Sequence, residues 1–256
     1  MRYLIILISV VPALPAAGLG EVVLYDPSLG TGPAAQGWTY AGLPLQNSAV
    51  QGPAAGAWSL NTTAAMSDSA GYFGLTHPDM PVLDRQQGYT LHFDAAVVSE
   101  NHASSNRAGF SVIALSDDNL GVELGFWTDE IWAQSTAFTH AEGAAWNSTA
   151  TTAYDLQVAG SGYRLLADGQ EILSGALRAY DGNVHPVYGL SNFLFVGDDT
   201  SSASADVLIG RVSVETNTGF VPEPATLTLL VAGLAGLGPR LRTLRRRRFG
   251  PNRPAA

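Results

Sequence analysis

The sequence contains no cysteine and no lysine, and these two absences narrow the chemistry open to the chain. Without cysteine there is neither a disulfide nor a thiolate ligand for a metal ion. The fold must therefore be held by packing alone, which one domain of about 200 residues can achieve. All 13 basic residues are arginine.

The charges are distributed unevenly along the chain. Residues 21–220 contain 21 Asp and Glu but only 5 Arg, a net charge of −16, whereas residues 240–256 contain 7 Arg and no acid. A surface so poor in cations cannot neutralise phosphates, so we expect no nucleic-acid partner. An acidic surface suits divalent cations or neutral polymers, although simple solvation of the charges is the plainest interpretation.

Residues 1–20 have the three-part layout of a secretory signal peptide. Arg2 supplies the positive start, an uninterrupted apolar run covers residues 4–11, and small residues follow. The apolar run is too short to remain as a membrane span. We therefore expect export, with cleavage within residues 16–20.

The end of the chain also has three successive parts. Residues 216–224 form a linker, residues 225–241 form an apolar helical segment, and residues 242–256 form an arginine-rich tail. The linker ends in the motif Val221, Pro222, Glu223 and Pro224, and the cytoplasmic anchor is expected at Arg240, Arg242, Arg245, Arg246, Arg247 and Arg248. Arginines at a helix end can snorkel to the interface, and they hold that end on the cytoplasmic side. The pattern thus predicts a transmembrane helix with the rest of the chain outside.

This order of motif, short apolar helix and arginine cluster resembles the PEP-CTERM sorting signal of Gram-negative bacteria. The resemblance covers residues 221–248, and the segment after the arginines is longer than such signals usually have. It implies a membrane-embedded exosortase as partner, which cleaves near the Pro-Glu-Pro motif. It also implies an intermediate anchored in the inner membrane, followed by delivery to the cell envelope, the surface or the extracellular matrix.

Residues 21–215 are predicted to form one all-β domain, an antiparallel β-sandwich without internal repeats. Alternation of apolar and polar residues, or short apolar runs between turns, indicates strands over residues 89–97, 107–115, 120–134 (two strands around a turn at 128–130), 154–158, 163–167, 170–174 and 205–214. Asp168-Gly169 is a strong signal for a two-residue hairpin. The Pro-, Ala- and Gly-rich stretch 42–56 is expected to be a surface loop.

The same strand pattern resembles the jelly roll of concanavalin-like and laminin-G-like domains. The strings LGVELGFWTDEIWAQ and FLFVGDDTSSASADVLIG further resemble the choice-of-anchor domains of bacterial surface proteins, the Y type in particular. The resemblance covers residues 22–215 and implies a fold and a surface location. It implies no particular ligand.

Two acidic clusters at probable strand ends are candidates for a structural calcium ion, Asp117 with Asp118 and Asp198 with Asp199. Calcium takes six to eight oxygen ligands, often from carboxylates on adjacent loops. Neither cluster has the spacing of an EF-hand loop, and aspartates also favour turns for their own sake. No other cofactor is predicted.

Trp127 and Trp132 flank the acidic turn Asp129-Glu130 and are candidates for carbohydrate contact. Aromatic rings can stack on the CH faces of sugars while carboxylates accept bonds from their hydroxyls. The alternative is that both indoles belong to the core, as tryptophan in a strand usually does. An extracellular polysaccharide is the partner this pattern suggests.

No catalytic residue is predicted. Jelly-roll glucanases carry Glu-x-Asp-x-(x)-Glu along one strand, and the residues after Glu123 break that pattern. The five histidines are scattered, with no metal-binding motif and no nucleophile turn. We therefore expect a non-catalytic protein with an adhesive, carbohydrate-binding or matrix-structural role. The alternative is a glycan hydrolase on the same scaffold.

Overall fold

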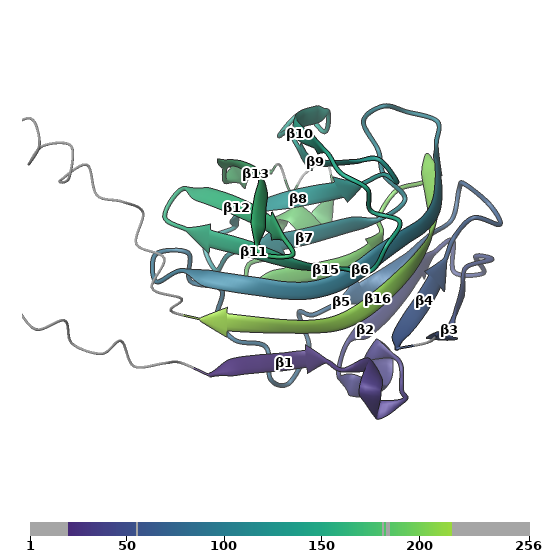
Figure 1. Ribbon diagram of the computed structural model, residues 1–256, viewed down its shortest axis with the longest axis horizontal. Helices are drawn as coiled ribbons and strands as arrows, with labels where there is room; N and C mark the ends of the chain where they lie inside the picture. Colours follow the sequence, from purple (N-terminus) through teal and green to yellow (C-terminus); the bar gives the residue numbers. More distant parts are fainter. Residues whose placement is uncertain (1–19, 55, 181, 183–184, 217–256) are drawn as a thin grey trace, which may run out of the picture. The chain divides into compact units, whose positions relative to one another are not determined.

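The computed structural model of the protein describes residues 20–54, 56–180, 182 and 185–216 (Figure 1). The chain divides into two units, Met1–Phe220 and Val221–Ala256, and every described residue belongs to the first. The predicted signal peptide, sorting motif, sorting helix and arginine tail all lie outside the described residues, apart from Gly20 and the first residue of the linker, Thr216. None of the helices within the described ranges is long and apolar enough to cross a membrane.

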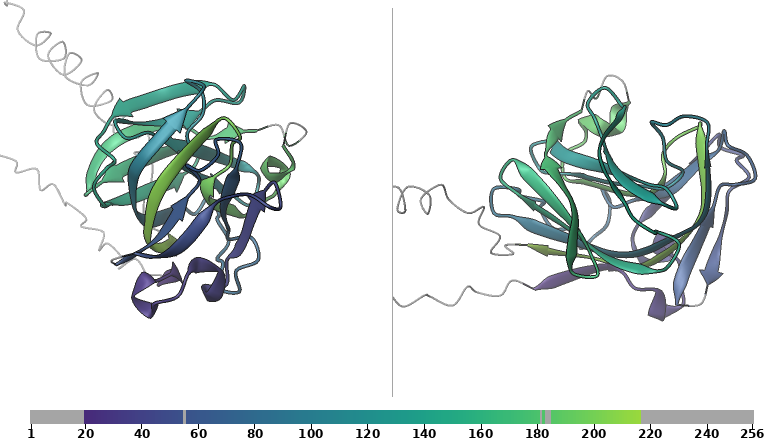
Figure 2. Two further views of the ribbon diagram at one scale, coloured as in Figure 1. Left: turned by 90° about the vertical axis from the view of Figure 1, so that its right-hand side faces the viewer. Right: turned by 45° about the horizontal axis from the view of Figure 1, so that its top comes forward.

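The described residues form a sandwich of two antiparallel sheets, as the sequence predicted (Figure 2). Sheet A has the order β13 (Gln170–Ala176), β12 (Gly162–Ala167), β11 (Thr152–Ala159), β6 (Tyr89–His102), β16 (Ala203–Thr216), β4 (Ala57–Asn61) and β3 (Val50–Ala54), and β1 (Glu21–Tyr25) also pairs with β16. Sheet B has the order β10 (His140–Ala145), β9 (Glu130–Gln134), β8 (Leu120–Phe126), β7 (Ser111–Leu115), β15 (Phe193–Asp198), β5 (Ser69–Phe73) and β2 (Thr39–Leu43), and β14 (Arg178–Ala179) also pairs with β8. Three short 3₁₀ helices complete the described elements: η1 (Pro27–Leu29), η2 (Pro33–Gln36) and η3 (Pro186–Gly189).

The side chains that the sequence alternation predicts to be buried do point into the core. On β6, the side chains of Tyr89, Leu91, Phe93, Ala95 and Val97 are all at most 2% exposed and belong to the core between the sheets. β6 and β16 lie side by side along almost their whole length (Figure 1). Because both are central strands, they carry much of the inner surface of sheet A.

The meander β11–β12–β13 is confirmed. Asp168 and Gly169 join β12 to β13 and both have positive φ, 48° and 79°. This is the conformation of a type I′ hairpin turn, which glycine adopts without strain.

The expected loop over residues 42–56 is wrong, because it contains β3 and the end of β2. These strands form the edges of sheets A and B, respectively. β3 is exposed or half-buried along its whole length and contains Gly52 and Pro53, so its sequence shows no apolar alternation. Pairing with β4 makes it a strand.

Candidate functional site

The outer face of sheet B, turned away from the sheet A core, carries a row of small residues that crosses five strands. The strand register places Ala41, Gly71, Gly197, Ser111 and Gly125 next to one another, from β2 to β8. A Cβ built on Gly71 would lie 2.4 Å from the ring of Phe195, so this ring lies directly against the glycine. The row therefore leaves room on the sheet surface for large neighbours.

Those large neighbours form the adjacent row on the same face. Phe73, Phe195, Ile113 and Glu123 follow one another across β5, β15, β7 and β8. The ring centroids of Phe73 and Phe195 are 5.0 Å apart, and Phe193 lies 5.8 Å from Phe73. This row of apolar side chains therefore ends at the carboxyl group of Glu123.

The helix η3 covers part of this face. The ring of Tyr188 lies 5.0 Å from those of Tyr180 and Phe138, and this cluster is continuous with Ile113 and Phe193. The apolar cover explains why strand β7 is apolar on both faces: Val112 and Ala114 enter the main core, while Ile113 and Leu115 lie beneath η3.

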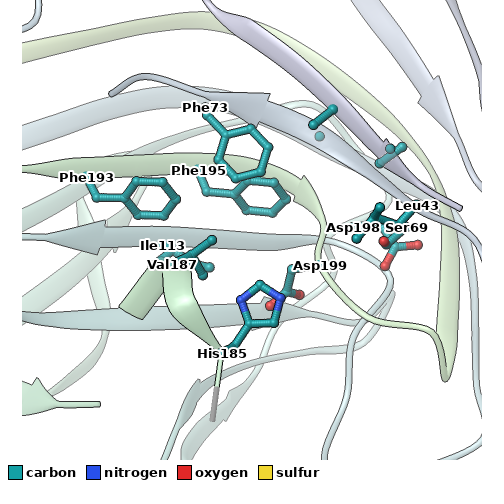
Figure 3. A pocket seen from close by; sticks show the side chains of 14 residues that line it. Leu43, Ser69, Phe73, Ile113, His185, Val187, Phe193, Phe195, Asp198 and Asp199 are labelled. Atoms are coloured by element: carbon teal, nitrogen blue, oxygen red, sulfur yellow. The ribbon is translucent and has the colours of Figure 1, made fainter. Parts of the chain in front are cut away.

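Two adjoining cavities open beside η3. The acidic cavity has a volume of about 180 Å³ and is lined by Arg107, Glu123, Phe138, His185, Val187, Tyr188 and Asp199. The phenylalanine cavity has a volume of about 80 Å³, and its large side chains include Phe73, Ile113, Phe193 and Phe195. The two share His185, Val187 and Asp199. Figure 3 shows the three phenyl rings gathered along one side of the phenylalanine cavity, with Asp199 next to His185 and Asp198 farther along, near Ser69.

A tyrosine hydroxyl joins two carboxyl groups in the acidic cavity. Tyr188 donates a hydrogen bond to Oε2 of Glu123, and its hydroxyl oxygen lies 3.5 Å from Oδ2 of Asp199. The two carboxyl groups come from different strands of sheet B, β8 and the end of β15. They are therefore separated by about the width of one hydroxyl group.

Burial, followed by the negative charge of Asp199, raises the pKa of Glu123 well above its usual value. Burial also raises the pKa of Asp199, against the effects of Ser111, Arg107 and His185. Glu123 is only 4% exposed, whereas Asp199 is open to solvent through the cavity mouth, so we assign the larger rise to Glu123. Burial also raises the pKa of the Tyr188 phenol, so the hydroxyl stays protonated and remains a donor.

Arg107 is the basic residue of the acidic cavity, and its guanidinium is held by backbone atoms. Its Nη1 donates to the carbonyl oxygens of Asn106 at 2.7 Å and Phe138 at 2.8 Å. The guanidinium also lies over the Phe138 ring, 5.7 Å from the centroid. This arrangement fixes Arg107 at the cavity wall.

The four aspartates predicted to bind calcium do not come together. Asp117 and Asp118 follow β7, whose end pairs with the start of β15, whereas Asp198 and Asp199 lie at the other end of β15. Asp118 instead forms an ion pair with Arg85 at 2.7 Å. Within the described ranges, no group of three or more His, Asp or Glu is arranged to hold a metal ion. The two clusters therefore do not share one ion, and calcium binding at either of them stays a prediction.

The two tryptophans predicted to contact sugar are largely occupied by protein. Trp132 is 1% exposed and stacks on His140 with ring centroids 4.4 Å apart, so it presents no free face to a ligand. Trp127 is half-buried and stacks on His102 at 4.2 Å. Its Nε1 donates to the carbonyl oxygen of Arg107 at 2.9 Å. The core interpretation is thus correct for Trp132, and Trp127 supports the backbone that carries Arg107.

The sequence analysis did not find this carboxylate pair, because the glucanase motif places both carboxyl groups on one strand. Here Glu123 lies on β8 and Asp199 follows β15. One signal was available: Glu123 is the single charged residue in the apolar strand 120–126. Tyr188 had no comparable signal, since it lies on η3 outside any strand pattern.

The small residues beneath the phenylalanine cavity, Gly71 among them, lead to a prediction about stability. Gly71→Ala should lower the free energy of unfolding by about 1–3 kcal/mol, because the new methyl group overlaps the Phe195 ring and must displace it. Gly52→Ala is the matched control, since a Cβ at Gly52 on strand β3 meets nothing within 4 Å. Urea unfolding of the two variants measures the difference, and equal stabilities would show that Phe195 does not lie against Gly71.

Comparison with known proteins identifies the fold but no family. No family model and no curated protein matches the chain. Among solved structures, a carbohydrate esterase from the Shiga toxin-encoding bacteriophage phi24B has a TM-score of 0.55 at 17% identity, covering 78% of this chain and 100% of that one. Domain 4 of the extracellular arabinanase AbnA from Geobacillus stearothermophilus, in complex with arabinotriose, has a TM-score of 0.46 at 12% identity, covering 78% and 93%. At 17% identity the similarity to the phage esterase establishes a shared β-sandwich architecture and nothing finer.

Proposed function

We propose that this chain is an exported cell-envelope protein whose sandwich domain binds carbohydrate in the two cavities on the outer face of sheet B. The observation that carries the proposal is the meeting of Glu123, Asp199 and Tyr188 with a phenylalanine-lined cavity. Ligand sites typically combine an apolar lining with a few polar groups that fix orientation. Carbohydrates need both, because their hydroxyls seek acceptors while their CH faces seek apolar surface. The phage esterase of similar fold is, by its name, also a carbohydrate-active protein.

Export and sorting form the second half of the proposal. The supporting features are the signal peptide layout of residues 1–20 and the order of Pro-Glu-Pro motif, apolar segment and arginines over residues 221–248. In this proposal a membrane-embedded exosortase is the processing partner. The finer jelly-roll and choice-of-anchor assignments belong to the same proposal.

The binding site is tested with the full chain on a glycan array. Asp199→Asn should weaken binding to the best glycan about tenfold or more, because a buried hydroxyl of the ligand loses a charged acceptor. Asp118→Asn is the control, since Asp118 lies at the opposite end of the β7–β15 pair and should leave affinity unchanged. Equal affinities for wild type and Asp199→Asn would place the site elsewhere.

Sorting is tested in a host that contains an exosortase. Glu223→Ala with Pro224→Ala should leave an uncleaved, membrane-retained protein, visible as a heavier band on a gel. The flanking prolines keep the motif extended, and the carboxylate marks the outer water interface, where burial in hydrocarbon would cost about 2.5–3.5 kcal/mol. Processing of the double variant like wild type would reduce the tail to a generic membrane segment.

A glycan hydrolase is the second candidate function, and one observation favours it. The sequence lacks the one-strand carboxylate motif of jelly-roll glucanases, but the structure brings Glu123 and Asp199 together at the Tyr188 hydroxyl. Retaining glycosidases place two carboxyl groups about 5 Å apart, with the more buried one acting as the acid. A reducing-sugar assay on the glycans bound by the array distinguishes the functions. Turnover that is lost in Glu123→Gln would make the protein an enzyme, and binding without turnover would make it a lectin-like module.

A further inference from the structure

We infer that the ligand of this site is a neutral glycan carrying an O-acetyl ester, with the acetyl group seated in the phenylalanine cavity and neighbouring hydroxyls meeting Asp199. This inference rests on the proposed carbohydrate-binding function and specifies its ligand class. It follows from three properties of the cavities: the apolar lining of one, the acidity of the other, and their shared boundary.

The lining of the phenylalanine cavity is unsuited to an ordinary sugar. Phe73, Phe193, Phe195, Ile113 and Val187 offer no hydrogen-bonding group. A hydroxyl placed among them would lose its bonds to water without compensation, which is strongly unfavourable. A group that enters this cavity must therefore end in an apolar atom such as a methyl carbon.

The polar residues of the same cavity stand at one side, where an ester would need them. Ser69 and His185 border the cavity and carry groups able to donate to an ester carbonyl, and Asp199 lies beside His185 (Figure 3). Asp198 also borders the cavity, but its carboxyl group is already bonded to Thr62 at 2.6 Å and to the amide of Thr200 at 3.1 Å. An acetyl group has the matching shape, with one methyl end and one carbonyl oxygen.

The size of the cavity agrees with an acetyl group. Its volume of about 80 Å³ exceeds several times the roughly 10–15 Å³ that one water molecule needs. The space exists because the backbone beneath it carries Ala41, Gly42, Ala70 and Gly71, none of which has a side chain longer than a methyl group.

The charge of the site excludes an anionic glycan. Glu123 and Asp199 face the acidic cavity, and residues 21–220 carry a net charge of −16. Arg107 is the one arginine in the lining; its Nη1 donates to two backbone carbonyls, and its charge acts on the same two carboxyl groups, which outnumber it. Uronic acids and sulfated sugars would be repelled, whereas neutral sugars offer hydroxyl donors to Asp199.

The test uses the full chain and matched pairs of glycans. O-acetylated xylan oligosaccharides are compared with the same oligosaccharides after alkaline deacetylation, by titration calorimetry. We expect the acetylated member to bind about tenfold or more tightly, the usual effect of filling or emptying an apolar pocket by a small group. Saturation-transfer NMR should show the strongest transfer to the acetyl methyl protons. A second pair, the methyl glycosides of D-rhamnose and D-mannose, which differ only at C6, asks whether a bare 6-deoxy methyl suffices.

Two variants separate the parts of the site. Phe73→Ser should abolish the preference for the acetylated member, because it places a hydroxyl at the half-buried wall of the cavity. Asp199→Asn should weaken both members by a similar factor and keep the preference. Equal affinity for the acetylated and deacetylated members, or a preference for the 6-deoxy sugar alone, would overturn this inference and leave the proposed function standing. An array with no bound glycan at all would overturn both.

Discussion

Phe126→Ala is expected to lower the free energy of unfolding by about 3–5 kcal/mol. Phe126 ends strand β8 in sheet B and is fully buried. Its ring centroid lies 6.0 Å from Phe93 and 5.4 Å from Tyr154, both in sheet A, and 5.2 Å from Phe110. The variant thus loses the ring that joins the two sheets and leaves a cavity where four aromatic side chains met.

The measurement is urea unfolding followed by circular dichroism. Leu45→Ala is the control, because Leu45 is 93% exposed and its truncation should change stability by less than about 0.5 kcal/mol. Because a natural domain is stable by only about 5–15 kcal/mol, the Phe126 variant should be close to unfolding at 37 °C. A loss as small as that of the control would show that the two sheets do not meet through this cluster.

Asp198→Asn is expected to remove much of the pH dependence of stability between about pH 4 and pH 8. Asp198 is 2% exposed, and burial raises its pKa to about 8, against hydrogen bonds from the Thr62 hydroxyl and the Thr200 amide. Between the ordinary pKa and the raised one, the folded state holds a proton that the unfolded state releases. The stability from this group is therefore present at low pH and is lost as the pH rises through about 8, with a slope of up to about 1.4 kcal/mol per pH unit.

Asparagine reproduces the protonated carboxyl at every pH. Its amide can donate to the Thr62 hydroxyl and accept from the Thr200 amide, so the variant should fold normally and be more stable than wild type at pH 9. Asp129→Asn, at an exposed turn, should keep the wild-type profile. Melting temperatures from pH 5 to pH 9 provide the comparison, and parallel profiles for wild type and Asp198→Asn would mean that Asp198 is ionised throughout.

The strands that the sequence predicted share one physical property: one face is buried in the main core. Residues 89–97 and 154–167 alternate clearly because their inward side chains are apolar and their outward side chains meet water. β2 and β3 show no such pattern, because edge strands bury little of either face. Pairing with a neighbour, which no local pattern records, is what makes them strands.

The candidate site could be predicted only in fragments. The sequence indicates Asp199 as a candidate calcium ligand together with Asp198, because the two are adjacent along the chain. Successive side chains in an extended chain point to opposite faces, and here Asp198 turns toward Thr62 while Asp199 faces the cavities. Trp127 and Trp132 stand out in the sequence as large aromatics, but their stacking partners do not: His102 lies on β6 of the other sheet, and His140 lies on the neighbouring strand β10.

The sequence by itself determined the class of this protein's fold, since the period-2 pattern of core strands and the Asp168-Gly169 turn are local properties that survive in any all-β arrangement. It also determined the charge of the domain, from which we expect no nucleic-acid partner. Only the tertiary structure decided where a ligand could bind. The register of β7, β8 and β15 brings Glu123 and Asp199 to one place, and η3 then covers them with Tyr188. Glu123 and Asp199 are 76 positions apart along the chain, and Phe73 and Phe195 are 122 apart, so the site exists only once the strands have paired.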